Sequence, residues 1–221
     1  VHFKELESRV KRKFEDYPLT CYLVDSSVIP RFQNEIFMRV NRGGERLTIQ
    51  EIRNASNVGK VTYLLNKISD NKELRIVPIK RKKDQYLVLR FLAYYLIHNN
   101  ESFMSIYNFD SDYDGIDNLL DRVMKFINII SDSEVNKLYS LYESCIQISK
   151  RMFELKSYKE FSRKDSNAVN MIIFESWLFL ISSFEKSVIE TNLDLFFDFY
   201  IKFIDDENFE DNILYRRDSK E

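Results

Sequence analysis

The sequence has few of the residues on which common active sites depend. Its 221 residues include four glycines, three prolines, two cysteines and two histidines. It contains no GxxxxGK[ST] phosphate loop, no HExxH and no GxSxG motif. These absences argue against a Walker-type nucleotide site, a common zinc metalloprotease and a serine hydrolase. His98 is interpreted as the end of a helix, where an imidazolium is favourable, rather than as part of a catalytic pair with His2.

Disulfides and membrane spans are equally unexpected. Cys21 and Cys145 are far apart, and neither has a second cysteine at CxxC spacing, which favours two small buried side chains in a reducing cytoplasm. No apolar run reaches the roughly 18 residues that cross a bilayer. The residues from Val1 onward show neither the basic n-region nor the apolar h-region of a signal peptide. We therefore expect a cytoplasmic protein with no membrane partner.

The charge balance gives no overall attraction to a polyanion. There are 33 basic and 35 acidic residues, for a net charge of -2, so contact with nucleic acid would depend on a local patch. The hydrophobic content of 44% and charged content of 31% are typical of a globular chain with a sizeable core.

What the chain does have is apolar residues at helical spacing. The pattern predicts a helix over 3–14, a short strand over 19–24 and a second helix over 29–40. Further helices are predicted at 61–68, 86–97, 116–130, 135–152, 168–183 and 193–204. The expected fold is mostly α, a multi-helix lobe with one or two short strands near the N-terminus. Its aromatic stripes are interpreted as core.

The acidic segment 110–121 is similar to the first half of an EF-hand loop. Aspartates occupy positions one, three and five, and Gly115 occupies position six. Position twelve carries Asp121 instead of the longer glutamate, and position eight carries Asp117 instead of an apolar residue. We interpret the segment as an acidic start of the next helix rather than as a calcium site.

Two further patterns can be interpreted either as functional motifs or as ordinary surface features. The basic run 80–83 could contact phosphates, but four charges at a helix start are typical of a solvated surface. The sequence of residues 154–156 matches the ExK element of many nucleases, but no aspartate on a preceding strand accompanies it. Neither pattern defines a site.

Gly43 and Gly44 stand side by side in this glycine-poor chain. They follow the predicted helix 29–40, where glycine readily adopts the left-handed conformation that closes a helix. Thr48 and Glu51 then form a predicted capping box that starts another helix. As local structure, the segment is a helix-loop-helix turn.

Arginines are concentrated around this turn, at Arg39, Arg42, Arg46 and Arg53. Backbone N–H groups at a helix start and guanidinium groups together suit an anion. The residues are compatible with a bound phosphate or a carboxylate of another lobe, as well as with a plain turn.

The string from Ile36 to Ala55 resembles the F-x-R-[LV]-N-x-G-G-x-x-L-x-x-Q-E-I-R-N-A segment typical of GmrSD-type restriction endonucleases. The residues in register are Phe37, Arg39, Asn41, Gly43, Gly44, Leu47, Gln50, Glu51, Ile52, Arg53, Asn54 and Ala55. Residues 80–96 and 167–180 are similar, more weakly, to helices that follow this segment in the same proteins.

The resemblance implies a ParB-like α/β lobe followed by a helical lobe. Residues 1–70 would be the end of the first lobe, with the glycine turn and the QEIRN helix, and residues 71–221 the helical bundle. The family's catalytic D-G-Q-Q-R-[LT] motif is absent, and its expected position lies upstream of Val1. No catalytic residue can therefore be assigned. The implied phosphate- or nucleotide-binding residues are Asn41, Arg42, Gly43, Gly44, Arg46 and Arg53, with Arg39, Glu51 and Asn54 in support.

The function implied by the resemblance is that of the helical portion of a modification-dependent, anti-phage DNA endonuclease or nucleoside triphosphate hydrolase. This portion alone would be inactive and would bind no metal or cofactor, whereas the complete domain would use magnesium and a nucleoside triphosphate. Its partners would be the ParB-like lobe and DNA, and a homodimer is left open. The alternative is a non-enzymatic helical interaction or regulatory module.

Overall fold

The computed structural model describes residues 2–18, 20, 47–77, 79–108, 113–156, 161 and 169–205. The chain divides into two compact units, Val1–Arg46 and Leu47–Glu221. This division falls at residue 46, and the QEIRN helix lies in the second unit. The lobe boundary at residue 70 stays a prediction. Apart from Thr20, the predicted strand over 19–24 lies outside the described residues, as does the predicted helix over 29–40.

In the first unit, the predicted helix over 3–14 is interrupted. A 3-10 turn, η1 (Phe3–Glu5), is followed by α1 (Ser8–Glu15), with Leu6 and Glu7 both extended at ψ 147°. The break lets the Phe3 and Phe14 rings meet with centroids 5.4 Å apart. In one continuous helix these residues would be about 16 Å apart along the axis. The interruption and the ring contact occur together, and no residue of η1 or α1 is buried.

The second unit is helical, and the mostly α fold is confirmed. Its helices are α3 (Ile49–Ser56), α4 (Lys60–Asp70), α5 (Lys83–Asn99), α6 (Glu101–Met104), α8 (Ile116–Ile129), α9 (Asp132–Leu155), α10 (Met171–Ser182), α11 (Lys186–Thr191) and α12 (Leu193–Ile204). No strand occurs within the described ranges. All six helices predicted beyond residue 60 are present, and α12 has the predicted bounds. Helices α6 and α11 were not predicted, because they are too short to show a helical spacing of apolar residues.

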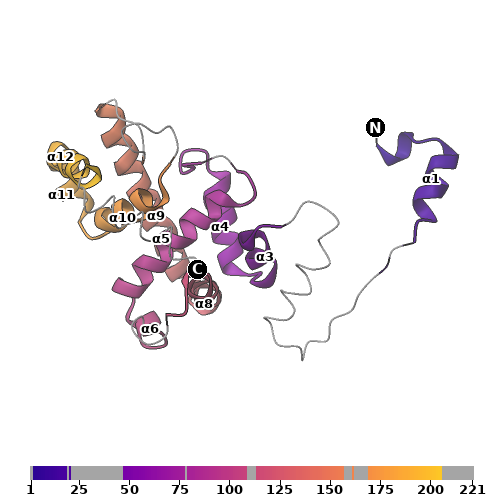
Figure 1. The fold of residues 1–221 in the computed structure, drawn as a ribbon, viewed down its shortest axis with the longest axis horizontal. Coiled ribbons are helices and arrows are strands. Elements are labelled where there is room, and N and C mark those ends of the chain that lie inside the picture. The colour runs from indigo at the N-terminus through magenta and orange to yellow at the C-terminus, as the bar shows by residue number, and fades with distance from the viewer. Residues whose placement is uncertain are drawn as a thin grey trace. The chain divides into compact units, whose positions relative to one another are not determined.

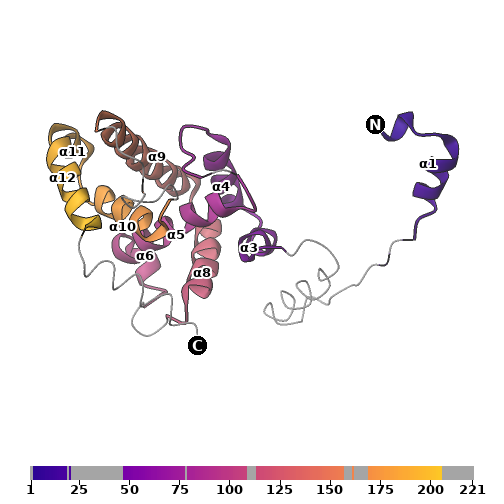
Figure 2. The same ribbon diagram turned by 45° about the horizontal axis from the view of Figure 1, so that its top comes forward.

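Helix α5 forms the centre of this unit. It contacts α3, α4, α6, α8 and α10, and Leu89, Phe91, Leu92 and Leu96 along it are fully buried. Burying one such side chain contributes about 1.5–3 kcal/mol. Figures 1 and 2 show α11 and α12 at one end of the helical unit and α3 at the other. In the described part of the chain, no helix is long and apolar enough to span a membrane.

Aromatic side chains join α9, α10 and α12. Tyr200 of α12 has ring centroids 4.9 Å from both Phe153 of α9 and Trp177 of α10, and both pairs are edge-to-face. Phe174 packs on Phe161 in the same way at 5.1 Å. The prediction that the aromatic stripes form core is confirmed for these residues, all of which are buried.

Cys145 on α9 is a free, buried cysteine, as predicted. Burial raises the pKa of its thiol to about 12, so the reactive thiolate is disfavoured at neutral pH. Cys145 is therefore a small core residue. Cys21 lies outside the described residues.

Candidate functional site

Helix α3 carries the described members of the predicted site, and its start is capped as predicted. The backbone N–H of Glu51 donates to the Thr48 hydroxyl at 3.2 Å, and the N–H of Thr48 donates to the Glu51 carboxylate at 2.7 Å. A cap of this kind is worth about 1 kcal/mol. The helix that follows the glycine-containing segment therefore has a defined first turn.

Glu51 also accepts from Arg81, which lies 30 positions later in the chain. Arg81 Nε is 3.1 Å from both carboxylate oxygens of Glu51, and Nη2 is 3.0 Å from Oε2. Burial by itself raises the pKa of Glu51, but the hydrogen bonds from Thr48 and Arg81 outweigh it, and the net pKa is lowered. Glu51 is thus held as a carboxylate between the start of α3 and the segment before α5.

The segment before α5 has an unusual backbone. Arg81 and Lys82 are both left-handed, with φ of 55° and 60°, although neither is glycine. Such a conformation is costly for residues with side chains and persists where surrounding contacts hold it. Two such contacts come from the start of α3, because Glu51 holds the Arg81 guanidinium and the Thr48 hydroxyl lies 3.1 Å from the Arg81 carbonyl.

Arg53 connects α3 to α8. Its Nε is 2.7 Å from Asp121 Oδ1, and its Nη2 is 3.0 Å from Asp117 Oδ1 and 3.3 Å from the Asp117 carbonyl. Its Nη1 donates to Gln50 at 2.8 Å. The Arg53 side chain is 1% exposed, whereas those of Asp117 and Asp121 are 51% and 39% exposed. The buried guanidinium therefore depends on carboxylates at the rim.

Asn54 begins a chain of amide hydrogen bonds that joins α3, α4 and α5. Its Oδ1 accepts from Gln50 at 2.8 Å, and its Nδ2 donates to Gln85 Oε1 at 2.5 Å. Gln85 in turn donates to Asn66 at 2.8 Å. Each amide satisfies its neighbour, which makes the network specific for one arrangement of the three helices.

The carboxylates bound to Arg53 bear on the EF-hand alternative. Asp121 would be the twelfth ligand of such a loop, but its Oδ1 accepts from Arg53. In the described ranges, no three His, Cys, Asp or Glu side chains are grouped so as to hold a metal ion. The contacts favour the interpretation of Asp117 and Asp121 as partners of Arg53. Residues 109–112 lie outside the described part of the chain.

The remaining predicted site residues lie outside the described residues, namely Arg39, Asn41, Arg42, Gly43, Gly44 and Arg46. Of the three that are described, Arg53 and Asn54 bind side chains of other helices, and Glu51 binds Arg81 in the segment before α5. Sequence reasoning missed their partners Arg81, Asp117, Asp121 and Gln85, because no short-range pattern relates positions 30 to 68 residues apart.

A second buried ion pair joins α5 to α10. Arg90 donates to Glu175 through Nε at 2.6 Å and through Nη2 at 2.5 Å, and its Nη1 is 3.1 Å from the Tyr86 hydroxyl. Burial by itself lowers the pKa of Arg90, but the hydrogen bonds and charge of Glu175 outweigh it and raise the pKa. The pair fixes two core helices and was not predicted from the sequence.

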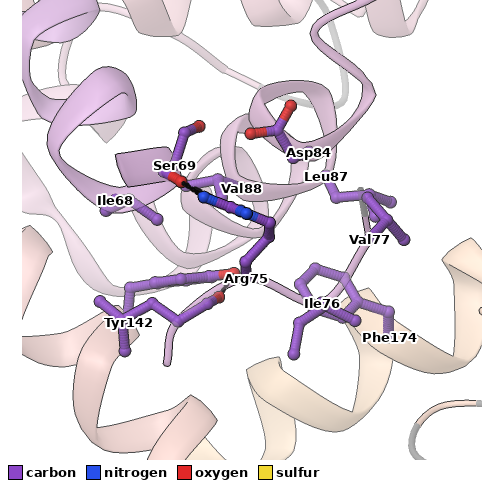
Figure 3. A pocket seen from close by; sticks show the side chains of 11 residues that line it. Ile68, Ser69, Arg75, Ile76, Val77, Asp84, Leu87, Val88, Tyr142 and Phe174 are labelled. Atoms are coloured by element: carbon purple, nitrogen blue, oxygen red, sulfur yellow. Dashed lines mark hydrogen bonds between the residues drawn. The ribbon is translucent and has the colours of Figure 1, made fainter. Parts of the chain in front are cut away.

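A small cavity lies beside this core. Figure 3 shows Ser69, Arg75, Asp84 and Tyr142 around it, with Arg75 donating to the Ser69 carbonyl at 2.7 Å. Among described groups, neither oxygen of the buried Asp84 has a hydrogen-bond partner. The cavity volume of about 10 Å³ is the smallest that can hold one water molecule, and it is far below the several hundred Å³ of a small-molecule site. This cavity is not a substrate pocket.

No family model, curated protein or solved structure matches this chain. The contacts of α3 are therefore the firmest basis for a functional proposal.

Proposed function

We propose that this chain is the helical support of a phosphate- or nucleotide-binding site in a GmrSD-like DNA restriction domain. The observation that carries the proposal is the triple anchoring of α3, the helix that directly follows the resembling glycine-containing segment. Glu51 binds Arg81, Arg53 binds Asp117 and Asp121, and Asn54 binds Gln85. A helix fixed at three points holds the N–H groups of its first turn in defined directions, which suits a helix N-terminus that contributes to a phosphate site.

The contacts divide the predicted residues into two roles. Arg53 directs all three guanidinium nitrogens to protein acceptors and is almost fully buried, which supports bracing rather than direct contact with a ligand. Glu51 and Asn54 brace in the same way. Direct contact with phosphate is assigned to Asn41, Arg42, Gly43, Gly44 and Arg46, with Arg39 in support.

The basic run at the start of α5 adds charge beside the α3 cap. Lys80 and Lys83 are exposed and Lys82 is half-buried, and no ion pair involves these three among the described residues. Arg81, within the same run, is held by Glu51. The Arg81 to Thr48 contact puts these amines close to the start of α3, where they would attract a polyanion such as DNA.

The complete domain would contain a ParB-like lobe and act on DNA in the cytoplasm. Magnesium and a nucleoside triphosphate would be its cofactors. The acidic residues in the described part of the chain do not form a magnesium site. No three of them are grouped so as to hold a metal ion, and Asp117 and Asp121 are bound to Arg53. No step of the proposal therefore passes through a metal on these residues.

The test is restriction of incoming modified DNA by the complete protein. We expect Arg42→Ala to abolish restriction without changing the melting temperature, and Arg9→Ala, a matched change on α1, to leave both unchanged. Arg53→Met should lower the melting temperature because it removes the anchor to α8. Full restriction by the Arg42→Ala variant would refute a phosphate-binding role for the turn.

A non-enzymatic interaction module is the second candidate, favoured by the exposed Leu195 and Phe199 on α12. If the chain is such a module, Arg42→Ala should not change restriction by the complete protein, and only variants that disturb folding, such as Gly43→Val, should reduce it. The two candidates are separated by measuring restriction and melting temperature for both variants: loss of restriction without loss of stability in Arg42→Ala supports the phosphate site.

A further inference from the structure

Helix α12 is apolar around most of its circumference. Its inner side buries Phe196, Tyr200 and Ile204, yet Leu195 is 66% exposed and Phe199 is 52% exposed on the outer side. A helix that is apolar on both sides is normally covered on both sides. The outer side of α12 therefore has the composition of an interface.

Leu195 and Phe199 lie one helical turn apart, and together they form what we call the α12 face. The partly exposed Phe184, just before α11, packs its ring on the inner side of α12, with its centroid 5.2 Å from that of Phe196. Figures 1 and 2 show that α12 lies at the end of the helical unit away from α3.

The charges beside the α12 face restrict what can cover it. Asp198 and Lys202 lie one helical turn apart, both are exposed, and within the described ranges neither takes part in an ion pair. By contrast, Asp194, one turn earlier, binds Lys156 at 2.5 Å. A surface complementary to these charges offers a base opposite Asp198 and an acid opposite Lys202. A second α12 in the antiparallel direction offers both.

We propose that two copies of this chain associate through their α12 faces about a two-fold axis. With the axis level with residue 200, Asp198 of each copy lies opposite Lys202 of the other, so the pair forms twice. At a rise of about 1.5 Å per residue, the two Phe199 side chains are then offset by only about 3 Å along the helix axis. Antiparallel helix dipoles add a favourable term.

This association does not depend on the proposed function. It would leave α3 and the basic run before α5 uncovered, because these lie at the other end of the helical unit. Dimerisation would place two α3 helices at opposite ends of the assembly, a geometry suited to binding two separate lobes or two segments of one long ligand.

Sedimentation equilibrium of the full chain over a concentration series tests the proposal. We expect the average mass to rise from one chain towards two. Asp198→Lys and Lys202→Asp should each weaken association about tenfold, because each change replaces two attractive pairs by two like-charge pairs. The double variant Asp198→Lys/Lys202→Asp should restore association, because it exchanges the charges without changing the symmetry.

Variants that replace exposed aromatic side chains by polar ones provide a second test of the proposed dimer. Phe199→Asp should abolish association, whereas Tyr63→Ser, which changes an aromatic residue that is 69% exposed on α4, should leave it unchanged. Circular dichroism verifies that each variant is folded. A monomer at every concentration would overturn the proposal and indicate a different protein as the partner of the α12 face. A dimer that Phe199→Asp leaves intact, or a double variant that fails to restore association, would overturn it as well.

Discussion

Arg53 on α3 and Asp121 on α8 lie 68 positions apart in the sequence, and Nε of the arginine is 2.7 Å from Oδ1 of the aspartate. The contact is asymmetric, because the Arg53 side chain is 1% exposed and that of Asp121 is 39% exposed. Water can replace the arginine at the aspartate, but little water can reach the arginine. The two sides of the pair should therefore respond differently to mutation.

The first prediction follows from this asymmetry. Asp117→Ala/Asp121→Ala should lower the free energy of unfolding by about 3–5 kcal/mol, because it leaves the buried guanidinium unpaired. Arg53→Met should cost less, about 1–3 kcal/mol, because the aspartates are solvated at the rim. Urea denaturation measures both, with Lys125→Ala on the exposed side of α8 as control. Equal costs in the two variants would show that Arg53 is less buried than described.

The second prediction concerns acid stability. Hydrogen bonds from Thr48 and Arg81 lower the pKa of Glu51 in the folded chain below its ordinary value of 4.5. The resulting stabilisation is fully present above the ordinary pKa and is lost as the pH falls through the lowered value. Glu51→Gln should therefore destabilise the chain at neutral pH and flatten the loss of stability below about pH 4.5. Urea denaturation at a series of pH values measures this, with the exposed Glu101→Gln as control.

The third prediction concerns the buried pair of Arg90 and Glu175. Glu175→Gln should cost about 3–5 kcal/mol because it leaves a buried guanidinium without its counter-charge. The double variant Arg90→Met/Glu175→Leu should cost less than Glu175→Gln alone, because no buried charge remains. Thermal and urea denaturation of the two variants give the comparison. A double variant less stable than the single one would mean that the pair contributes net stability beyond satisfying its own charges.

The fourth prediction concerns Gly59, which precedes α4. A Cβ at this position would lie 2.5 Å from Oδ1 of Asn128, the atom that accepts from the Val61 N–H at 3.0 Å. Gly59→Ala should therefore displace Asn128 and cost about 1–3 kcal/mol. In an Asn128→Ala background the same change should cost less, because the clash is gone and only the backbone strain of an alanine at φ 158° remains. A double-mutant cycle with no coupling between the two positions would contradict this explanation.

Local rules predicted the helical elements well. The bounds of α12 follow from the spacing of its apolar residues alone, and the Thr48 and Glu51 capping box was visible in the sequence because both partners lie within one turn. The same rules failed at Leu6 and Glu7, which are extended and allow the Phe3 and Phe14 rings to meet. The spacing of apolar residues indicates which face of a helix is apolar, but it does not show where the helix is interrupted.

For the candidate site, the family resemblance grouped Glu51, Arg53 and Asn54, with Arg53 assigned to phosphate binding and the other two to support, but it gave none of their partners. A cluster of arginines near a glycine pair suggests anion binding, and the same pattern serves a buried arginine that needs acidic partners. The choice for Arg53 depends on Asp117 and Asp121, which reach it only because α8 packs beside α3 in the fold.

The helical class, most helix positions and the cap of α3 could be predicted from the amino-acid sequence, because they depend on residues within a few positions of one another. Three further features emerge only in the packed fold: Arg53 binds α8, Glu51 holds Arg81 in a left-handed turn, and α12 keeps an exposed apolar side. Those outcomes depend on which helices pack together, and packing is set by the whole core rather than by any local pattern.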